Sequence, residues 1–143
     1  MDRENWIFIS SFSHSSHRNL IDSGYRHLGS IQILGSVPHL SPLYDSADLL
    51  ITPPCSVTVT EAMVKRLPMA ILDPVSGCEA RNLAFLLPRG GVISAHNVNA
   101  LCDACADLLY DQNALSLMAD SLRLMAPEPA VETIYRTMTM LKS

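Results

Sequence analysis

The sequence lacks two features that would point to nucleic acid or to a membrane interior. Its ten Lys and Arg residues are scattered over 143 positions, and the formal net charge is −4. Nucleic-acid-binding domains usually carry a basic patch or stripe, so we expect no nucleic-acid partner. No apolar stretch reaches the roughly 18 residues that span a bilayer. The N-terminal segment 1–6 is too polar for a signal peptide, so we expect a cytoplasmic protein.

The sequence also lacks a pattern of cysteines for disulfides or metal. Four cysteines in a chain of this size do not form a disulfide scaffold. Cys102 and Cys105 form a Cys-x-x-Cys within an apolar helical pattern, without a second Cys or His pair at zinc spacing. We interpret them as small buried hydrophobic residues on one helix face. We therefore expect no metal site.

The composition and the apolar pattern predict one globular α/β domain over residues 1–143. Hydrophobic residues make up 48% of the chain and charged residues 17%, which is typical of a protein with a buried core. Short apolar runs alternate with helical patterns, which predicts a parallel sheet with flanking helices. The predicted strands are 6–9, 31–34, 48–51, 69–72 and 91–94, and the predicted helices are 17–28, 41–46, 58–65, 78–87, 98–110, 112–125 and 131–141.

Two strand–loop–helix units between Asp48 and Asn82 carry most of the chemical information. Pro53 and Pro54 end the first of these strands, because proline cannot donate to a strand ladder. Both loops open at the carboxyl ends of strands, where open α/β sheets bind their ligands. Both loops also lead into helix N-termini, which favour anionic groups such as phosphates. We therefore predict a site for an anionic ligand.

The same residues also allow a purely structural interpretation. Thr58 with Glu61, and Ser76 with Glu79, each have the spacing of a helix capping box. Gly77 can relax a tight turn, and Asn82 can lie on a solvated helix face. From spacing alone this interpretation is the stronger one. The two roles are compatible, because a first-turn glutamate at the carboxyl edge of a sheet also faces the cleft.

An ordered set of motifs resembles the donor-binding domain of GT-B glycosyltransferases. The motifs are Ala47-Asp-Leu-Leu-Ile-Thr52, Thr58-x-Thr-Glu-Ala62, Leu67-Pro-Met-Ala-Ile71, Asp73-Pro74, Gly77-x-Glu79 and Asn82. They are similar to the family that includes monogalactosyldiacylglycerol synthases and processive diacylglycerol glucosyltransferases, and more distantly to the bacterial lipid II N-acetylglucosaminyltransferase. The resemblance begins near Trp6 and implies a Rossmann-like parallel sheet, one half of a GT-B enzyme. The chain matches this domain from its second strand onward, so we expect it to lack the first strand.

The resemblance implies a hexosyltransferase that transfers a hexose from a UDP-sugar to a diacylglycerol-type lipid. The diphosphate would lie at the start of the helix near Thr58, the ribose at Glu61, and the donor sugar at the second loop. The implied nucleotide-sugar-binding residues are Cys55, Ser56, Val57, Thr58, Glu61, Gly77, Cys78, Glu79 and Asn82. No metal or other cofactor is required. An N-terminal acceptor domain, or a subunit in trans, would supply the acceptor site, the usual catalytic base and any peripheral membrane contact.

The sequence departs from the family at this loop. Family members usually carry Lys-Pro-Gly-Gly where this chain has Pro53-Pro-Cys-Ser56, and glutamine where it has Cys78. Glycine pairs let a backbone approach phosphate and adopt positive φ. An alternative therefore stays open, a non-catalytic Rossmann-like binding module or remnant with a degenerate phosphate loop. The catalytic base is not identified: His14 lies in the nearest loop, and a surface position is its simpler interpretation.

Overall fold

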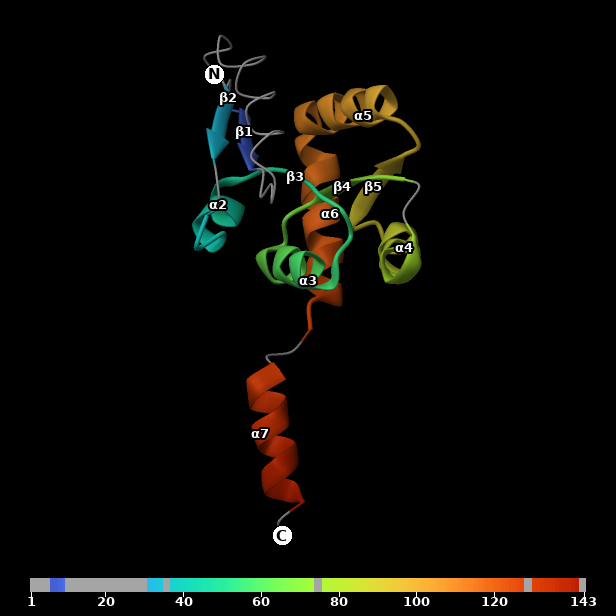
Figure 1. Cartoon of the computed structure of the whole chain (residues 1–143). Coiled ribbons are helices and arrows are strands. Elements are labelled where there is room, and N and C mark those ends of the chain that lie inside the picture. Colours follow the sequence, from blue (N-terminus) through green and yellow to red (C-terminus); the bar gives the residue numbers. More distant parts are fainter. Residues whose placement is uncertain (1–5, 10–30, 35–36, 74–75, 128–129, 142–143) are drawn as a thin grey trace. The chain divides into compact units, whose positions relative to one another are not determined.

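The computed structural model describes residues 6–9, 31–34, 37–73, 76–127 and 130–141 of the chain (Figure 1). The chain divides into two compact units, residues 1–41 and residues 42–143. The helix predicted over 17–28, the loop that contains His14, and Pro74 lie outside the described residues.

The first unit contains a pair of parallel strands. Strand β1 (Trp6–Ile9) pairs with strand β2 (Ile31–Leu34), with Trp6 opposite Ile31 and Ile9 opposite Leu34. Both strands have the bounds predicted from their short apolar runs. Parallel neighbours are what an alternation of strands and helices predicts, because a parallel pair needs a crossover connection between its strands.

The second unit contains a three-stranded parallel sheet in the order β3-β4-β5. The strands are β3 (Leu50–Ile51), β4 (Met69–Leu72) and β5 (Val92–Ala95). The predicted parallel sheet with flanking helices is thereby confirmed. In the central strand, Met69, Ala70 and Ile71 are fully buried. Such a continuous apolar run, without polar alternation, is typical of a parallel strand that is covered on both faces.

The helices follow the strands as the apolar pattern predicts. They are α2 (Ser41–Ser46), α3 (Ser56–Lys65), α4 (Gly77–Leu86), the short 3-10 turn η1 (Leu87–Arg89), α5 (Val98–Tyr110), α6 (Gln112–Met125) and α7 (Ala130–Met140). Helix α3 begins two residues before the predicted start. Among the described residues, no helix combines the length and the apolar character needed to cross a bilayer.

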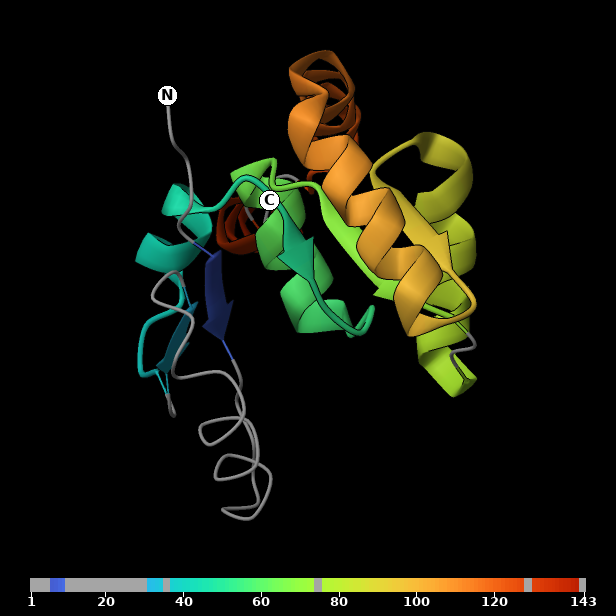
Figure 2. The same cartoon turned by 90° about the horizontal axis from the view of Figure 1, so that it is seen from above.

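Helices cover both faces of the three-stranded sheet. Figure 1 shows α5 on one side of β4 and β5, and α3 and α4 on the other. Leu101 and Cys105 of α5 pack with Ala70 of β4. Helix α6 contacts both α3 and α5. Figure 2 shows these helices from above. Leu122 of α6 comes so close to Gly91, just before β5, that a Cβ added there would lie 2.6 Å from Leu122 Cδ2, so a larger residue at this position would require Leu122 to shift.

Candidate functional site

Three helices begin at the carboxyl edge of the β3-β4-β5 sheet. Helix α3 follows β3, α4 follows β4 and α5 follows β5, and all three strands are parallel. Their loops therefore open on the same edge, which is where ligands bind in open α/β folds. All nine predicted nucleotide-sugar-binding residues belong to the first two of these strand–loop–helix units.

The loop between β3 and α3 is short and tightly bonded. The Cys55 N–H donates to the Pro53 carbonyl at 2.9 Å, and the Thr52 hydroxyl donates to the same carbonyl at 3.0 Å. The Pro54 side chain is fully buried. Because proline fixes φ, Pro53 and Pro54 further restrict the backbone of this loop. The loop presents the start of α3 in a defined direction.

Helix α3 begins without a side-chain cap. Its N-cap residue is Cys55, with φ −72° and ψ 146°, and no cap hydrogen bond is made by its side chain. The predicted capping box of Thr58 and Glu61 is wrong, because the helix starts at Ser56. Thr58 consequently lies in the first turn and Glu61 in the second. The first N–H groups of α3 have no intrahelical partner and receive no acceptor from the capping residue.

Helix α4 also begins without a side-chain cap. Ser76 is its N-cap residue and Glu79 lies in its first turn, as the second capping box predicts, but Ser76 makes no side-chain cap bond. Gly77 has a φ of +63°, a left-handed conformation that L residues other than glycine rarely adopt. The prediction that Gly77 relaxes a tight turn is confirmed.

Asn82 joins helix α4 to the β3–α3 loop. Its Nδ2 donates to the Pro54 carbonyl at 2.8 Å and to Ser56 Oγ at 3.3 Å. The expectation that Asn82 lies on a solvated helix face is therefore wrong, because its side chain is half-buried and bonded to the neighbouring loop. This contact brings the start of α3 and the first turns of α4 together in one site.

The side chains at the family's glycine positions are accommodated without backbone strain. Among the described residues, the one non-glycine position with positive φ is Arg66, so neither Cys55 nor Ser56 is strained. The Cys55 thiol donates to Thr58 Oγ1 at 3.0 Å, and Ser56 Oγ accepts from Asn82. The side chains of Val57 and Cys78 are exposed, and Glu79, next to Cys78, is half-buried.

Tyr44 of α2 is a neighbour of the site that the sequence patterns do not flag. Its side chain is buried, with 6% exposure. Burial raises the pKa of its hydroxyl, the nearby Glu61 carboxylate raises it further, and a hydrogen bond with Thr58 lowers it. Tyr44 thus links two predicted ligand-binding residues from the side of α2. No local signal identifies it, because its partners come from a later helix.

Asp73 and His96 form a pair at the carboxyl edge of the sheet that the sequence patterns do not flag. His96 Nδ1 is 3.1 Å from Asp73 Oδ2, and the Asp73 N–H donates to the Ala95 carbonyl at 2.9 Å. Asp73 directly follows β4 and His96 directly follows β5. A polar residue immediately after each of two neighbouring parallel strands is the signal that predicts such a pair.

The Cys-x-x-Cys lies away from this edge, within α5. Cys105 is 4% exposed, as predicted, and burial together with nearby Cys102 raises the pKa of its thiol. Cys102 is exposed, so the prediction that both are buried is wrong for this residue. Residues three apart on an α-helix are separated by about 60° around the axis. The edge of the buried face therefore falls between them.

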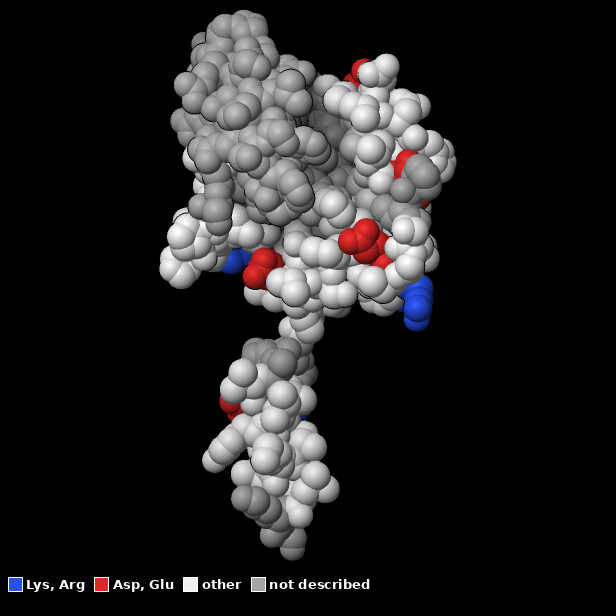
Figure 3. All heavy atoms as spheres, viewed as in Figure 1, with Lys and Arg blue, Asp and Glu red and all other residues white. Residues whose placement is uncertain are grey.

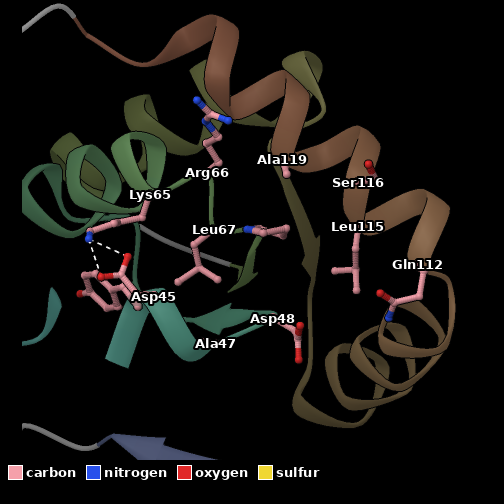
Figure 4. Close-up of a pocket in the computed structure, with 12 residues that line it drawn as sticks. Asp45, Ala47, Asp48, Lys65, Arg66, Leu67, Gln112, Leu115, Ser116 and Ala119 are labelled. Carbon is pink, nitrogen blue, oxygen red and sulfur yellow. Dashed lines mark hydrogen bonds and ion pairs between the residues drawn. The ribbon is translucent and has the colours of Figure 1, made fainter. Parts of the chain in front are cut away.

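A cavity of about 320 Å³ lies at the opposite edge of the sheet, where the strands begin (Figure 4). It is lined by Tyr44, Asp45, Ala47, Asp48, Lys65, Arg66, Leu67, Pro68, Gln112, Leu115, Ser116 and Ala119. Lys65 Nζ lies 2.6 and 2.7 Å from the two carboxylate oxygens of Asp45. The Asp45 carboxylate thus neutralises the positive charge of Lys65. None of the nine predicted residues lines this cavity.

The described residues carry few charges on the face shown in Figure 3. The acidic and basic side chains of the described residues are dispersed over it, and its Lys and Arg side chains do not cluster. None of the nine predicted site residues is basic. Any anion at this site would therefore be held by backbone N–H groups and helix dipoles.

Comparison with known proteins gives processive diacylglycerol beta-glucosyltransferases among the relatives of this chain. The chain is 28% identical over 99 residues to a processive diacylglycerol beta-glucosyltransferase of Staphylococcus carnosus, covering 69% of this chain and 25% of that protein. It is 26% identical over 117 residues to the Bacillus pumilus enzyme of the same name, covering 82% and 30%. The chain is a homologue of these glucosyltransferases. It spans about a quarter to a third of the length of these curated relatives.

The fold agrees with this relationship. The structure of Acinetobacter baumannii MurG superposes on this chain with a TM-score of 0.76 at 17% sequence identity. The superposition covers 95% of this chain and 42% of MurG. The predicted Rossmann-like GT-B fold is therefore confirmed. No protein-family model matches the sequence.

Proposed function

We propose that this chain is the donor-binding half of a sugar-nucleotide-dependent hexosyltransferase. In this function it binds a UDP-sugar, and the hexose passes to a diacylglycerol-type lipid held by an N-terminal acceptor domain or by a subunit in trans. The proposal is supported by relatives named processive diacylglycerol beta-glucosyltransferases. We further propose a cytoplasmic location with peripheral membrane contact through the acceptor part.

The observation that carries the proposal is the Asn82–Pro54 hydrogen bond of 2.8 Å, which holds the second turn of α4 against the loop before α3, and both helices begin uncapped. Each helix N-terminus carries a partial positive charge of about half an elementary charge. Two such ends in one site favour a ligand with two neighbouring anionic groups, such as a diphosphate. The exposed Glu61 carboxylate would then accept hydrogen bonds from the ribose hydroxyls, and Glu79 from those of the sugar.

The test is a titration of the full chain with UDP, followed by calorimetry and by amide NMR shifts. We expect binding, with the largest shifts at Ser56, Val57 and Thr58. Glu61→Ala should weaken it at least about tenfold, because a hydrogen bond to a charged group contributes about 1.5–3 kcal/mol. Glu132→Ala, an exposed glutamate of α7, is the matched control and should leave the affinity unchanged. Absence of binding up to millimolar UDP would contradict the proposal.

A second candidate function is a non-catalytic nucleotide-binding module. The observation that favours it is the exposed Cys78, which lacks the amide that the family's glutamine would offer to sugar hydroxyls. UDP and UDP-glucose distinguish the two functions, because a module of this kind gains nothing from the hexose. Equal affinities for the two ligands, together with tighter UDP-glucose binding by Cys78→Gln, would favour the module.

A further inference from the structure

The amide of Asn82 is committed to the β3–α3 loop. Its Nδ2 donates to the Pro54 carbonyl at 2.8 Å and to Ser56 Oγ at 3.3 Å. A backbone carbonyl can only accept, so the group that faces it must be the NH₂ and not the oxygen of the amide. The Pro54 contact therefore determines the orientation of the Asn82 side chain.

The Pro54 carbonyl needs a partner from outside its own loop. The first backbone hydrogen bond of α3 runs from the Val59 N–H to the Cys55 carbonyl, so the carbonyl of Pro54 lies just outside the helix. The Cys55 N–H is turned back to the Pro53 carbonyl. An unpaired, partly buried carbonyl destabilises the fold, and the Asn82 amide removes this cost.

We propose that Asn82 is a positioning residue for the β3–α3 loop. This inference rests on the proposed function, in which the first N–H groups of α3 bind the diphosphate. Asn82 holds the loop from the side of α4 and so fixes the direction of those N–H groups. Ser56, which stands at a glycine position of the family, is the second point of attachment for the same amide.

Three ligands separate positioning from sugar binding in Asn82→Ala. A positioning residue affects whatever the diphosphate loop binds, so UDP and UDP-glucose should both bind about fivefold more weakly, in line with the loss of one hydrogen bond. Uridine, which has no phosphate, should bind with unchanged affinity. A loss confined to UDP-glucose would make Asn82 a sugar ligand and overturn the inference. Asn99→Ala, an exposed asparagine of α5, is the matched control.

Amide hydrogen exchange gives a readout that does not depend on UDP. Asn82→Ala should speed exchange at the N–H groups of Cys55 and Val59, which are bonded at 2.9 Å within the loop and first turn. Ser56→Ala should speed it less, because its contact with Asn82 is longer. Unchanged exchange in Asn82→Ala would overturn the positioning role. Wild-type protein that fails to bind UDP, while Asn82→Ala still speeds exchange, would overturn the proposed function alone.

Discussion

Helices α5 and α6 begin differently from helices α3 and α4. The Asn97 side chain accepts the Ala100 N–H at 2.9 Å at the start of α5, and the Asp111 side chain accepts two N–H groups at the start of α6. Cys55 and Ser76, at the corresponding positions of α3 and α4, make no such bond. An N-cap side chain typically stabilises a helix by about 1 kcal/mol. The chain forgoes this stabilisation at two of its helices.

Position in the sheet does not explain the difference. Helix α5 starts at the same carboxyl edge as α3 and α4, because it follows the parallel strand β5. What α3 and α4 share is the contact made by Asn82 of α4, which joins this helix to the loop before α3. The uncapped N–H groups thus belong to the two helices, α3 and α4, that Asn82 connects. This arrangement suits an anionic ligand and gives little to the stability of the free chain.

The largest contrast between the two pairs of helices should appear in cysteine reactivity. Cys78 is exposed at the start of α4, whereas Cys105 is buried within α5 and its thiol pKa is raised by that burial. Iodoacetamide should alkylate Cys78 and Cys102 at least about a hundredfold faster than Cys105, whose modification requires local opening. Peptide mass spectrometry measures the rates. Similar rates at Cys78 and Cys105 would mean that α5 is not packed as described.

Replacing the N-cap residue should lower the stability of the chain at α6 and not at α4. Asp111→Ala should lower the free energy of unfolding by about 1.5 kcal/mol, because two N–H groups lose their acceptor. Ser76→Ala should change it by less than about 0.5 kcal/mol, since Ser76 makes no cap bond. Urea denaturation followed by circular dichroism provides both values. Equal losses in the two variants would remove the distinction between capped and uncapped helices.

Stability at the start of α4 should depend on the backbone conformation of Gly77 and not on a capping side chain. Gly77→Ala should destabilise the chain by about 1 kcal/mol, because alanine is strained at a φ of +63°. A Cβ at this position meets no atom within 4 Å, so the expected loss comes from the backbone alone. Gly77→Asn should lose less, because asparagine tolerates the left-handed region. Thermal denaturation compares the two variants, and equal losses would point to a steric cause.

The smallest expected effect is a pH dependence that arises at Tyr44. Its pKa is raised above the ordinary 10.0, chiefly by burial and then by Glu61, so the folded chain holds this proton more tightly than the unfolded chain. The resulting stabilisation is complete below pH 10 and is lost as pH rises through the raised pKa. Urea unfolding between pH 8 and pH 11 should show a shallower decline in Tyr44→Phe than in wild type. Tyr110→Phe, which alters an exposed tyrosine, should follow the wild type.

Local patterns in the sequence predict the elements of this fold well. The apolar run Met69-Ala-Ile-Leu72 gives the bounds of β4, and the periodic patterns give the bounds of α5 and α6. Gly77 was correctly placed in a tight turn because only glycine readily adopts positive φ. The misplaced start of α3 has a local cause as well. A capping box at Thr58 competes with a start at Ser56, and spacing alone does not distinguish them.

The composition of the candidate site was also predicted from the sequence, but its internal contacts were not. The nine residues follow from motif order and remain predicted ligands of a nucleotide sugar. Asn82 and Pro54 are 28 residues apart, and Tyr44 meets Thr58 and Glu61 through the packing of a separate helix. Such contacts depend on how the elements pack, which no local pattern encodes.

The sequence by itself determined the order of strands and helices, the parallel sheet and the resemblance to glycosyltransferase donor domains. These follow from short-range physics, namely the apolar period, the fixed φ of proline and the positive φ of glycine. The tertiary structure alone decided that Asn82 is bonded to the neighbouring loop, that Cys102 is exposed beside a buried Cys105, and that α3 and α4 begin uncapped. A side chain's partner is set by which surfaces meet on folding, and those surfaces come from distant parts of the chain.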